Sequence, residues 1–152
     1  IAIGCHFKVP AEAICEALGG YIPSNNRSQL TETADNHLIV DAYNANPTSM
    51  MAALENFRLM EVSHKVAILG DMKELGEGSV DEHRKIVSFL EGCGFERIIL
   101  VGDEFGKANS GFEWYKNTDD LKAKISEEKI SGKFVLIKGS NSMKLAPLKD
   151  IL

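Results

Sequence analysis

The stretch that decides the fold is Asp41-Ala-Tyr-Asn-Ala-Asn-Pro47. It follows the apolar run Leu38-Ile39-Val40 and precedes residues 48–57, which have the pattern of a helix. A short apolar run bounded by turn residues is typical of a buried strand, and Asn46 followed by proline is typical of a helix N-cap and first turn. Polar side chains are therefore predicted at the C-terminal end of a strand, beside a helix N-terminus, where open α/β sheets bind ligands.

Strand-like and helix-like segments alternate along the rest of the chain. The predicted strands are 38–42, 65–70, 97–101 and 133–138, with a short fifth strand at 112–115, and the predicted helices are 47–60, 80–92, 118–128 and one within 143–152. Continuous apolar strands that alternate with amphipathic helices indicate a parallel sheet covered on both faces. The fold class we expect is therefore α/β, with three layers and a mostly parallel sheet flanked by helices.

A shorter segment precedes this pattern. Residues 10–18 are predicted to form a short helix, which Gly19-Gly20 would end. The following residues, 21–36, are polar and contain Pro23 and paired asparagines, so they are interpreted as a linker. We place a domain boundary at residues 35/36.

Composition narrows the class of protein. The chain has 152 residues, 44% hydrophobic and 26% charged, which is a globular composition without an apolar run as long as a membrane span. Its formal net charge of −5, without a basic stripe, argues against nucleic acid as the main partner. Three scattered cysteines favour a reducing cytosol over a disulfide scaffold. The missing initial methionine leads us to expect a fragment of a longer protein.

Three polar, glycine-bearing loops follow predicted strands: 41–47, 70–79 and 138–142. Right-handed crossovers would bring all three to the same edge of the sheet. In the second loop, Asp71 has two interpretations, a ligand for ribose or a metal-bound water, or a turn aspartate bonded to its own backbone. In the third, Lys138-Gly-Ser140 suits an anion but is not a P-loop, since GxxxxGK[ST] is absent from the sequence.

Three further polar residues stand out. Ser79 with Glu82 fits a capping box. His83 has helical spacing from an apolar face, so we favour a packed core histidine over a ligand contact. Arg27, in the predicted linker, has the chemistry to grip a phosphate across a domain cleft, although a solvated arginine is the simpler interpretation.

Taken in order and spacing, these segments resemble the C-terminal domain of the Mur ligase family. The resemblance rests on Asp41–Pro47, on Leu69-Gly-Asp-Met-Lys-Glu-Leu-Gly76 with Ser79 and His83, and on Lys138-Gly-Ser-Asn-Ser-Met143. It covers roughly residues 38–145. It implies a Rossmann-like domain over 36–152, preceded in 1–35 by the end of the family's central ATPase domain and the interdomain linker.

The resemblance also implies an activity. Within the family it points to the ligase that joins D-alanyl-D-alanine to UDP-N-acetylmuramoyl-tripeptide through an acyl phosphate, in cytoplasmic peptidoglycan precursor synthesis. ATP and Mg²⁺ would be the cofactors, bound mainly by a central domain that this chain lacks. We therefore expect the fragment to be an inactive monomer, with no nucleic acid partner and no membrane insertion.

The implied site residues fall into two groups. For ATP they are Arg27, Asn44, Asn46 and Asp71. For D-alanyl-D-alanine they are Tyr43, Asn46, Lys138 and Ser140. No catalytic residue and no metal ligand is assigned to this chain by the resemblance.

Two other functions stay open on the sequence alone. One is a non-catalytic nucleotide- or amino-acid-binding module of the same fold. The other is the related C-terminal domain of a folylpolyglutamate synthetase. The sequence departs from the family pattern at Ala146-Pro147, where we expect the last helix to start late or kink.

Overall fold

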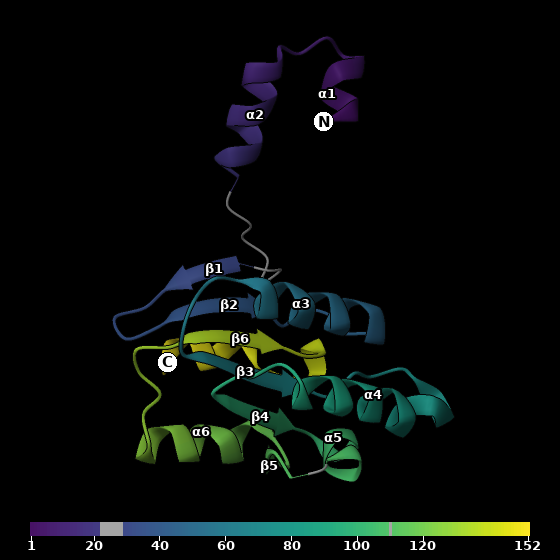
Figure 1. Cartoon of the computed structure of the whole chain (residues 1–152), viewed down its shortest axis with the longest axis vertical. Coiled ribbons are helices and arrows are strands. Elements are labelled where there is room, and N and C mark those ends of the chain that lie inside the picture. Colours follow the sequence, from purple (N-terminus) through teal and green to yellow (C-terminus); the bar gives the residue numbers. More distant parts are fainter. Residues whose placement is uncertain (22–28, 110) are drawn as a thin grey trace.

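The computed structural model describes residues 1–21, 29–109 and 111–152 (Figure 1). In chain order the elements are α1 (Ala2–His6), α2 (Ala11–Gly19), β1 (Gln29–Glu32), β2 (His37–Asp41), α3 (Pro47–Leu59), β3 (Lys65–Gly70), η1 (Gly76–Gly78), α4 (Ser79–Glu91), β4 (Arg97–Val101), α5 (Asp103–Ala108), β5 (Glu113–Tyr115), α6 (Thr118–Glu127), β6 (Phe134–Lys138), η2 (Asn141–Met143) and η3 (Ala146–Asp150).

The strands form one sheet in the order β1-β2-β6-β3-β4-β5. Among the described strands, only the β1–β2 pair is antiparallel, and the other four pairs are parallel. The last long strand, β6, therefore inserts between β2 and β3, which are consecutive parallel strands in the chain. This insertion brings the end of β6 beside the end of β2, and the register pairs Asp41 with Lys138.

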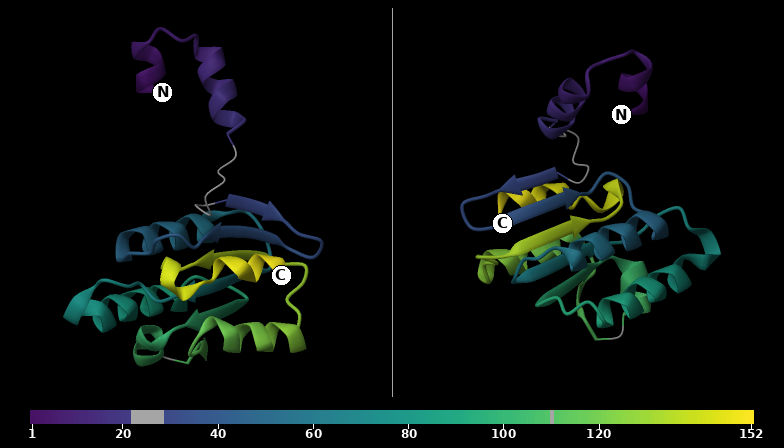
Figure 2. Two further views of the ribbon diagram at one scale, coloured as in Figure 1. Left: turned by 180° about the vertical axis from the view of Figure 1, so that it is seen from behind. Right: turned by 45° about the horizontal axis from the view of Figure 1, so that its top comes forward.

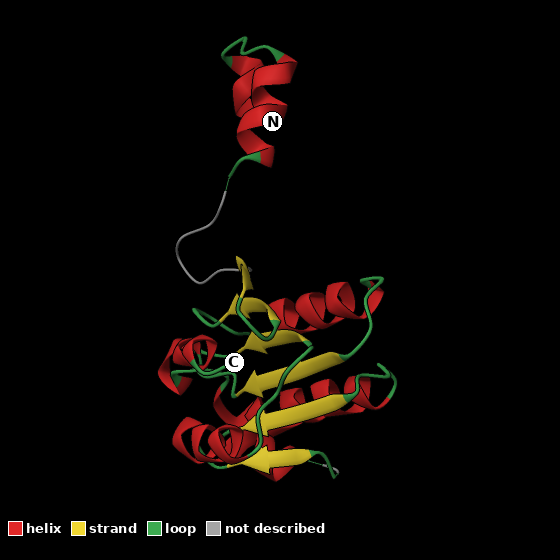
Figure 3. Cartoon of the chain, turned by 90° about the vertical axis from the view of Figure 1, so that its left-hand side faces the viewer, coloured by secondary structure: helices red, strands yellow, loops and turns green. Residues whose placement is uncertain are grey.

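The sheet is the middle of three layers, and Figure 3 shows helices on both of its sides. The residues of α3, α4 and α5 share one apolar cluster with strand residues such as Leu69 and Leu136. The residues of α6 and η3 share a second cluster with Ile68 and Ile137, and these elements face the viewer in the left panel of Figure 2. Neighbouring strand residues thus enter opposite clusters, as the two-residue period of a strand requires.

Burial explains why the strands are continuous apolar runs. In β3, five consecutive residues from Val66 to Gly70 are buried, and Arg97 is the only residue of β4 that is not. Each fully buried Leu or Ile side chain stabilises the fold by roughly 1.5–3 kcal/mol relative to exposure. The α/β class and the mostly parallel sheet predicted from the sequence are confirmed.

Three elements differ from the prediction. Residues 29–32, assigned to the linker, form edge strand β1, so the sheet begins before the predicted boundary at 35/36. The short helix α5 was not predicted. The final segment forms two 3₁₀ helices, with Pro147 in the first turn of η3, so the expected late start is confirmed but the segment is not an α-helix.

Two helices, α1 and α2, precede the sheet in the chain. The predicted helix at 10–18 is confirmed as α2, and α1 precedes it. All residues of both helices are described, and none of them is buried. Exposed apolar side chains include Ile1, Ile3 and Phe7, each more than 70% exposed.

Across the described ranges 1–21, 29–109 and 111–152, no helix combines the length and apolar character needed to cross a membrane.

Candidate functional site

The three polar loops predicted to meet do lie along one edge of the sheet. They follow β2, β3 and β6, which run parallel and in register, so their carboxyl ends coincide. The second and third loops touch directly, because the backbone N–H of Ser140 donates to the carbonyl of Asp71 at 3.2 Å. A Cβ on Gly139 would lie 3.0 Å from the Cα of Gly70, so a side chain there would push the loops apart.

The first loop ends in a helix cap, as the sequence predicts. The side-chain oxygen of Asn46 accepts from Ser49 N at 2.8 Å, and Ser49 Oγ accepts in return from Asn46 N at 3.1 Å. This reciprocal pair is a capping box, and Pro47 occupies the first turn of α3. Tyr43, Asn44 and Asn46 are all exposed on the loop that leads into this cap.

The base of the first loop is held by a lysine from the third. Lys138 is 1% exposed, and its ammonium donates to Asp41 Oδ2 at 2.5 Å and to the Asn44 carbonyl at 3.5 Å. A buried lysine requires a charged partner, and the register of β2 and β6 supplies it. Lys138 is therefore not the solvated strand-end lysine that the sequence alone allows.

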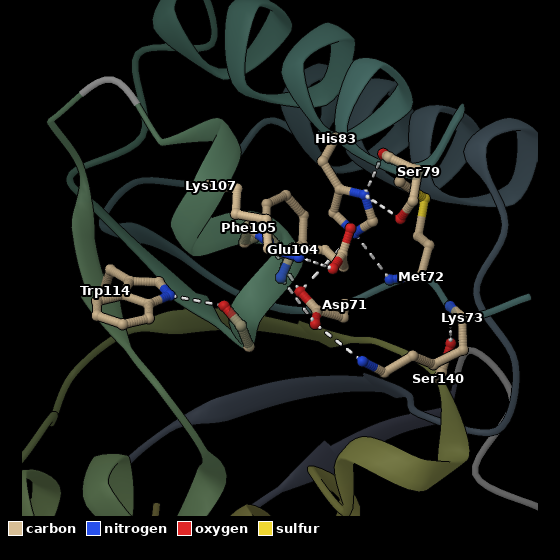
Figure 4. A network of polar contacts seen from close by, with 11 residues as sticks. Asp71, Met72, Lys73, Ser79, His83, Glu104, Phe105, Lys107, Trp114 and Ser140 are labelled. Carbon is tan, nitrogen blue, oxygen red and sulfur yellow. Dashed lines mark hydrogen bonds and ion pairs between the residues drawn. The ribbon is translucent and has the colours of Figure 1, made fainter. Parts of the chain in front are cut away.

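Asp71 lies fully buried at the end of β3 (Figure 4). Its carboxylate accepts from the backbone N–H of Phe105 at 2.9 Å and of Glu104 at 3.1 Å, and from the ammonium of Lys73 at 3.0 Å. The two amides are the second and third of α5, which have no partner within their own helix. Asp71 thus caps α5 from the start of the loop after β3, rather than accepting from the backbone of its own turn.

The residue that precedes α5 makes room for this cap. Gly102 is the N-cap of α5, with φ of 120°, and it has no side chain to accept from the helix. A Cβ at this position would lie 2.3 Å from Asp71 Cγ. The carboxylate of Asp71 therefore occupies the place where the side chain of an ordinary N-cap residue would be.

His83 fixes the second loop from beneath. Its ring is fully buried in α4; Nε2 lies 3.1 Å from the N–H of Met72, and Nδ1 lies 2.7 Å from the Ser79 carbonyl. These partners assign the proton to Nδ1 and leave Nε2 as the acceptor. The predicted packed histidine is confirmed, whereas the predicted capping box is wrong: Gly78 is the N-cap of α4 and no side chain caps the helix.

A cleft lies between the second loop, the segments that follow β4 and β5, and residues 142–144. Ser140 is buried, and its hydroxyl accepts from the backbone N–H of Lys73 at 2.9 Å. The cleft has a volume of about 370 Å³ and a mixed lining, with the lysines Lys73, Lys116, Lys122 and Lys144 beside the acids Asp71, Asp103 and Asp119. Among the lysines, Lys73 has 44% of its side chain exposed and is held in place by Asp71, so its ammonium can pair with a small anion.

One titratable pair lies next to the cap of α5. The ammonium of Lys107 is 2.6 Å from Glu104 Oε1 and holds the pKa of that carboxyl below its usual range, helped by a hydrogen bond from Ser79. The same contact raises the pKa of Lys107. Glu104 is therefore a carboxylate near neutral pH.

The predicted site residues divide into exposed and buried groups. Tyr43, Asn44 and Asn46 face solvent, whereas the other three described residues lie beneath the surface and bond to protein atoms. These three are Asp71, Lys138 and Ser140. Arg27 lies outside the described residues.

Two residues with defined roles in this network were not predicted as site residues. Asp41 is the partner of Lys138, and Lys73 links Asp71 to the cleft. Both stand in loops that the sequence singles out. A signal for Asp41 was available, since an acid directly after a buried strand is a feature of ligand-binding edges.

Among the residues that the structure describes, no three His, Cys, Asp or Glu side chains group closely enough to hold a metal ion.

Comparison with known proteins identifies the family. Residues 26–141 match the family described as "Mur ligase, glutamate ligase domain". The chain belongs to the Mur ligase family. The match covers the sheet from β1 to β6, the first two loops of the site and the third loop as far as Asn141, so this domain of the family carries the network described above.

Curated relatives of this Mur ligase chain share one name. The UDP-N-acetylmuramoyl-tripeptide–D-alanyl-D-alanine ligase of Treponema pallidum is 30% identical over 100% of this chain and 35% of its own length. The enzyme of the same name from Bacillus subtilis is also 30% identical, over 100% of this chain and 36% of its own. The chain therefore spans about a third of the length of these relatives.

Solved structures agree with this Mur ligase fold. A crystal structure of MurF from Acinetobacter baumannii superimposes with a TM-score of 0.79 at 27% identity, covering 98% of this chain and 34% of that one. MurF from Thermotoga maritima, solved with ADP, gives 0.73 at 20% identity over 91% and 35% of the two chains. A folylpolyglutamate synthase from the same organism gives 0.58 at 18% identity over 94% and 34%, a likeness of fold alone.

Proposed function

We propose that this chain is the C-terminal part of an ATP-dependent ligase that joins D-alanyl-D-alanine to UDP-N-acetylmuramoyl-tripeptide, a cytoplasmic step in peptidoglycan synthesis. The names of the curated relatives support the substrates. The observation that carries the proposal is the single edge of the sheet on which the three loops meet, with exposed amides beside a helix N-terminus. Such an edge is where α/β domains bind ligands.

The proposed reaction has two steps. ATP transfers its γ-phosphoryl group to the tripeptide carboxylate, which gives an acyl phosphate and ADP. The amine of the dipeptide then attacks the acyl carbon, phosphate leaves with the bonding electrons, and the nitrogen loses a proton. The acyl phosphate must be kept from water, which closure of two domains around it would achieve.

In this proposal the chain binds and orients substrates rather than supplying a reacting group. Asn44 and Asn46 would contact the nucleotide, together with Arg27, and Tyr43 and Asn46 would contact the dipeptide. The exposure of the loop that carries Tyr43, Asn44 and Asn46 supports this assignment. Asp71 would contribute by holding Lys73 at the cleft, since its own carboxylate is enclosed by hydrogen-bond donors.

The dipeptide ends in a carboxylate, which requires a positive partner. Lys138 and Ser140 were predicted for this role, but both are buried and bonded to protein atoms. The cleft, which neither of these residues lines, presents Lys73 to solvent. We therefore assign the carboxylate to this cleft, with Ser140 supporting its wall.

The N-terminal segment fits the same proposal. Its two helices bury no residue of their own and expose several large apolar side chains. Such helices need further protein to cover them. We propose that residues before the sheet are the end of a central ATPase domain and the linker, and that this chain alone, as a monomer, does not ligate.

The test uses the full-length protein and phosphate release that depends on both ATP and D-alanyl-D-alanine. Asn46→Asp keeps a side chain that caps helices well but removes the amide donor. We expect a fall in kcat/KM of at least roughly tenfold, as for a lost hydrogen bond to a charged ligand, with the melting temperature unchanged.

The matched control is Ser49→Ala, which removes the other half of the capping box and leaves the Asn46 amide in place. It should lower the melting temperature slightly and lower kcat/KM by much less than Asn46→Asp does. Activity of Asn46→Asp equal to that of the unsubstituted enzyme would reject the role of this loop. A parent enzyme without dipeptide-dependent turnover would reject the proposed function.

A further inference from the structure

A buried ion pair joins the first and third loops of the site. Lys138 is the last residue of β6 and the register partner of Asp41, the last residue of β2. Its ammonium lies 2.5 Å from Asp41 Oδ2, and the lysine is 1% exposed. Asp41 has 18% of its side chain exposed, so the pair lies just beneath the surface of the edge.

The surroundings of Lys138 leave little access for a ligand. An anion that bound the ammonium directly would have to reach a buried side chain and compete with the Asp41 carboxylate. If the ligand displaced that carboxylate, the negative charge of Asp41 would lie next to the negative charge of the ligand, and their repulsion would oppose binding. Direct binding of a carboxylate by Lys138 is therefore unfavourable in this conformation.

The same ammonium also reaches the backbone of the first loop, donating to the Asn44 carbonyl at 3.5 Å. The loop is thus held at two points: at its start by Lys138, and at its end by the capping box of Asn46 and Ser49. Between these points lie Tyr43 and Asn44, both exposed. Two fixed ends restrict where those side chains can go.

We propose that Lys138 is a positioning residue, which acts through Asp41 and the Asn44 carbonyl to fix the loop Asp41–Pro47 for ligand binding, and does not contact the ligand itself. This inference rests on the proposed function, because the loop is the one assigned there to the nucleotide and the dipeptide. It replaces the role predicted from the sequence, in which Lys138 binds the dipeptide carboxylate.

The first test compares two substrates in the full-length enzyme: D-alanyl-D-alanine and its C-terminal amide, which lacks the carboxylate. Lys138→Met should lower kcat/KM for both substrates by the same factor, so that the preference for the acid over the amide stays within about twofold of the unsubstituted value. A lower fraction of folded enzyme cannot change this ratio. Loss of the preference in Lys138→Met would mean direct contact and would overturn the proposal.

The second test is a double-mutant cycle with Asp41→Asn. If the two residues act as one pair, each single substitution should raise the KM for ATP, and the double variant should be no worse than the poorer single variant. Effects that multiply in the double variant would show independent contacts and overturn the pair. Unchanged kinetics in Lys138→Met would overturn it as well.

Lys138→Arg covers the case in which the methionine variant does not fold, because it keeps the buried charge. It should fold, retain the preference for the acid, and show an intermediate KM for ATP. An arginine variant with loss of the acid preference would again indicate direct contact. A parent enzyme without any dipeptide-dependent turnover would instead reject the proposed function.

Discussion

Replacing Asp71 tests the network that organises the site. The carboxylate is fully buried and accepts hydrogen bonds from two backbone amides of α5 and from one lysine. Asp71→Ala removes every acceptor. Asp71→Asn keeps one oxygen but turns an amide group with its own hydrogens toward one of the donors. We expect stability in the order Asp, Asn, Ala.

The magnitude follows from the two amides. A buried donor left without a partner costs about 1–3 kcal/mol, so two of them place the loss for Asp71→Ala at roughly 2–6 kcal/mol, with about 4 kcal/mol as the central value. In a chain of this size, 1 kcal/mol shifts the melting temperature by roughly 2–4 °C. The expected fall is therefore about 8–16 °C.

Two measurements on the chain test this reasoning. Thermal unfolding gives the overall loss, and amide hydrogen exchange locates it. Exchange should accelerate most at Glu104 and Phe105, whose N–H groups lose their acceptor. A melting temperature within 2 °C of the unsubstituted chain (roughly 1 kcal/mol or less), or unchanged protection of those two amides, would refute the cap.

Three further predictions concern stability. Arg97 holds the pKa of Glu113 below its usual range, so the ionised Glu113 stabilises the fold above its unfolded pKa of about 4.3. Glu113→Gln should therefore lower the free energy of unfolding at neutral pH. In an acid denaturation series, the difference in stability between variant and unsubstituted chain should shrink as the pH falls through the lowered pKa. Burial, and then Glu113, raise the pKa of Tyr115 to about 12. The free energy of unfolding measured in urea titrations should therefore decline between about pH 10 and pH 12. Tyr115→Phe should remove the part of this decline that is due to ionisation of the tyrosine. Leu54→Ala, at a fully buried position, should cost about 2–5 kcal/mol in the same titrations, and a cost below 1 kcal/mol would contradict the packing described.

The sequence predicts elements well where burial decides the residue types. The strands at 65–70 and 97–101 match the prediction to the residue, because a central parallel strand is apolar throughout. The sequence-based prediction fails for β1, Gln29–Glu32, which is a polar edge strand with Leu30 exposed. The prediction also misses α5, which has six residues and takes its cap from Asp71, a residue far away in the sequence, so no local signal indicates this helix.

For the site, the sequence predicts the edge but not the partners. The loops after β2, β3 and β6 meet as expected, because parallel strands align their ends. Which side chains bond to one another depends on strand order, and the position of β6 between β2 and β3 is not encoded in any short segment. That order places Lys138 beside Asp41, and therefore turns a candidate ligand contact into a buried pair.

The close fit of Asp71 against Gly102 implies that the two positions depend on each other over evolutionary time. A side chain at 102 would need the space that the carboxylate fills, and a helix that carried its own N-cap residue would no longer need that carboxylate. We expect an alignment of this domain across the family to show the two positions covarying. Sequences with Ser, Asp or Asn at 102 should then have a smaller residue at 71.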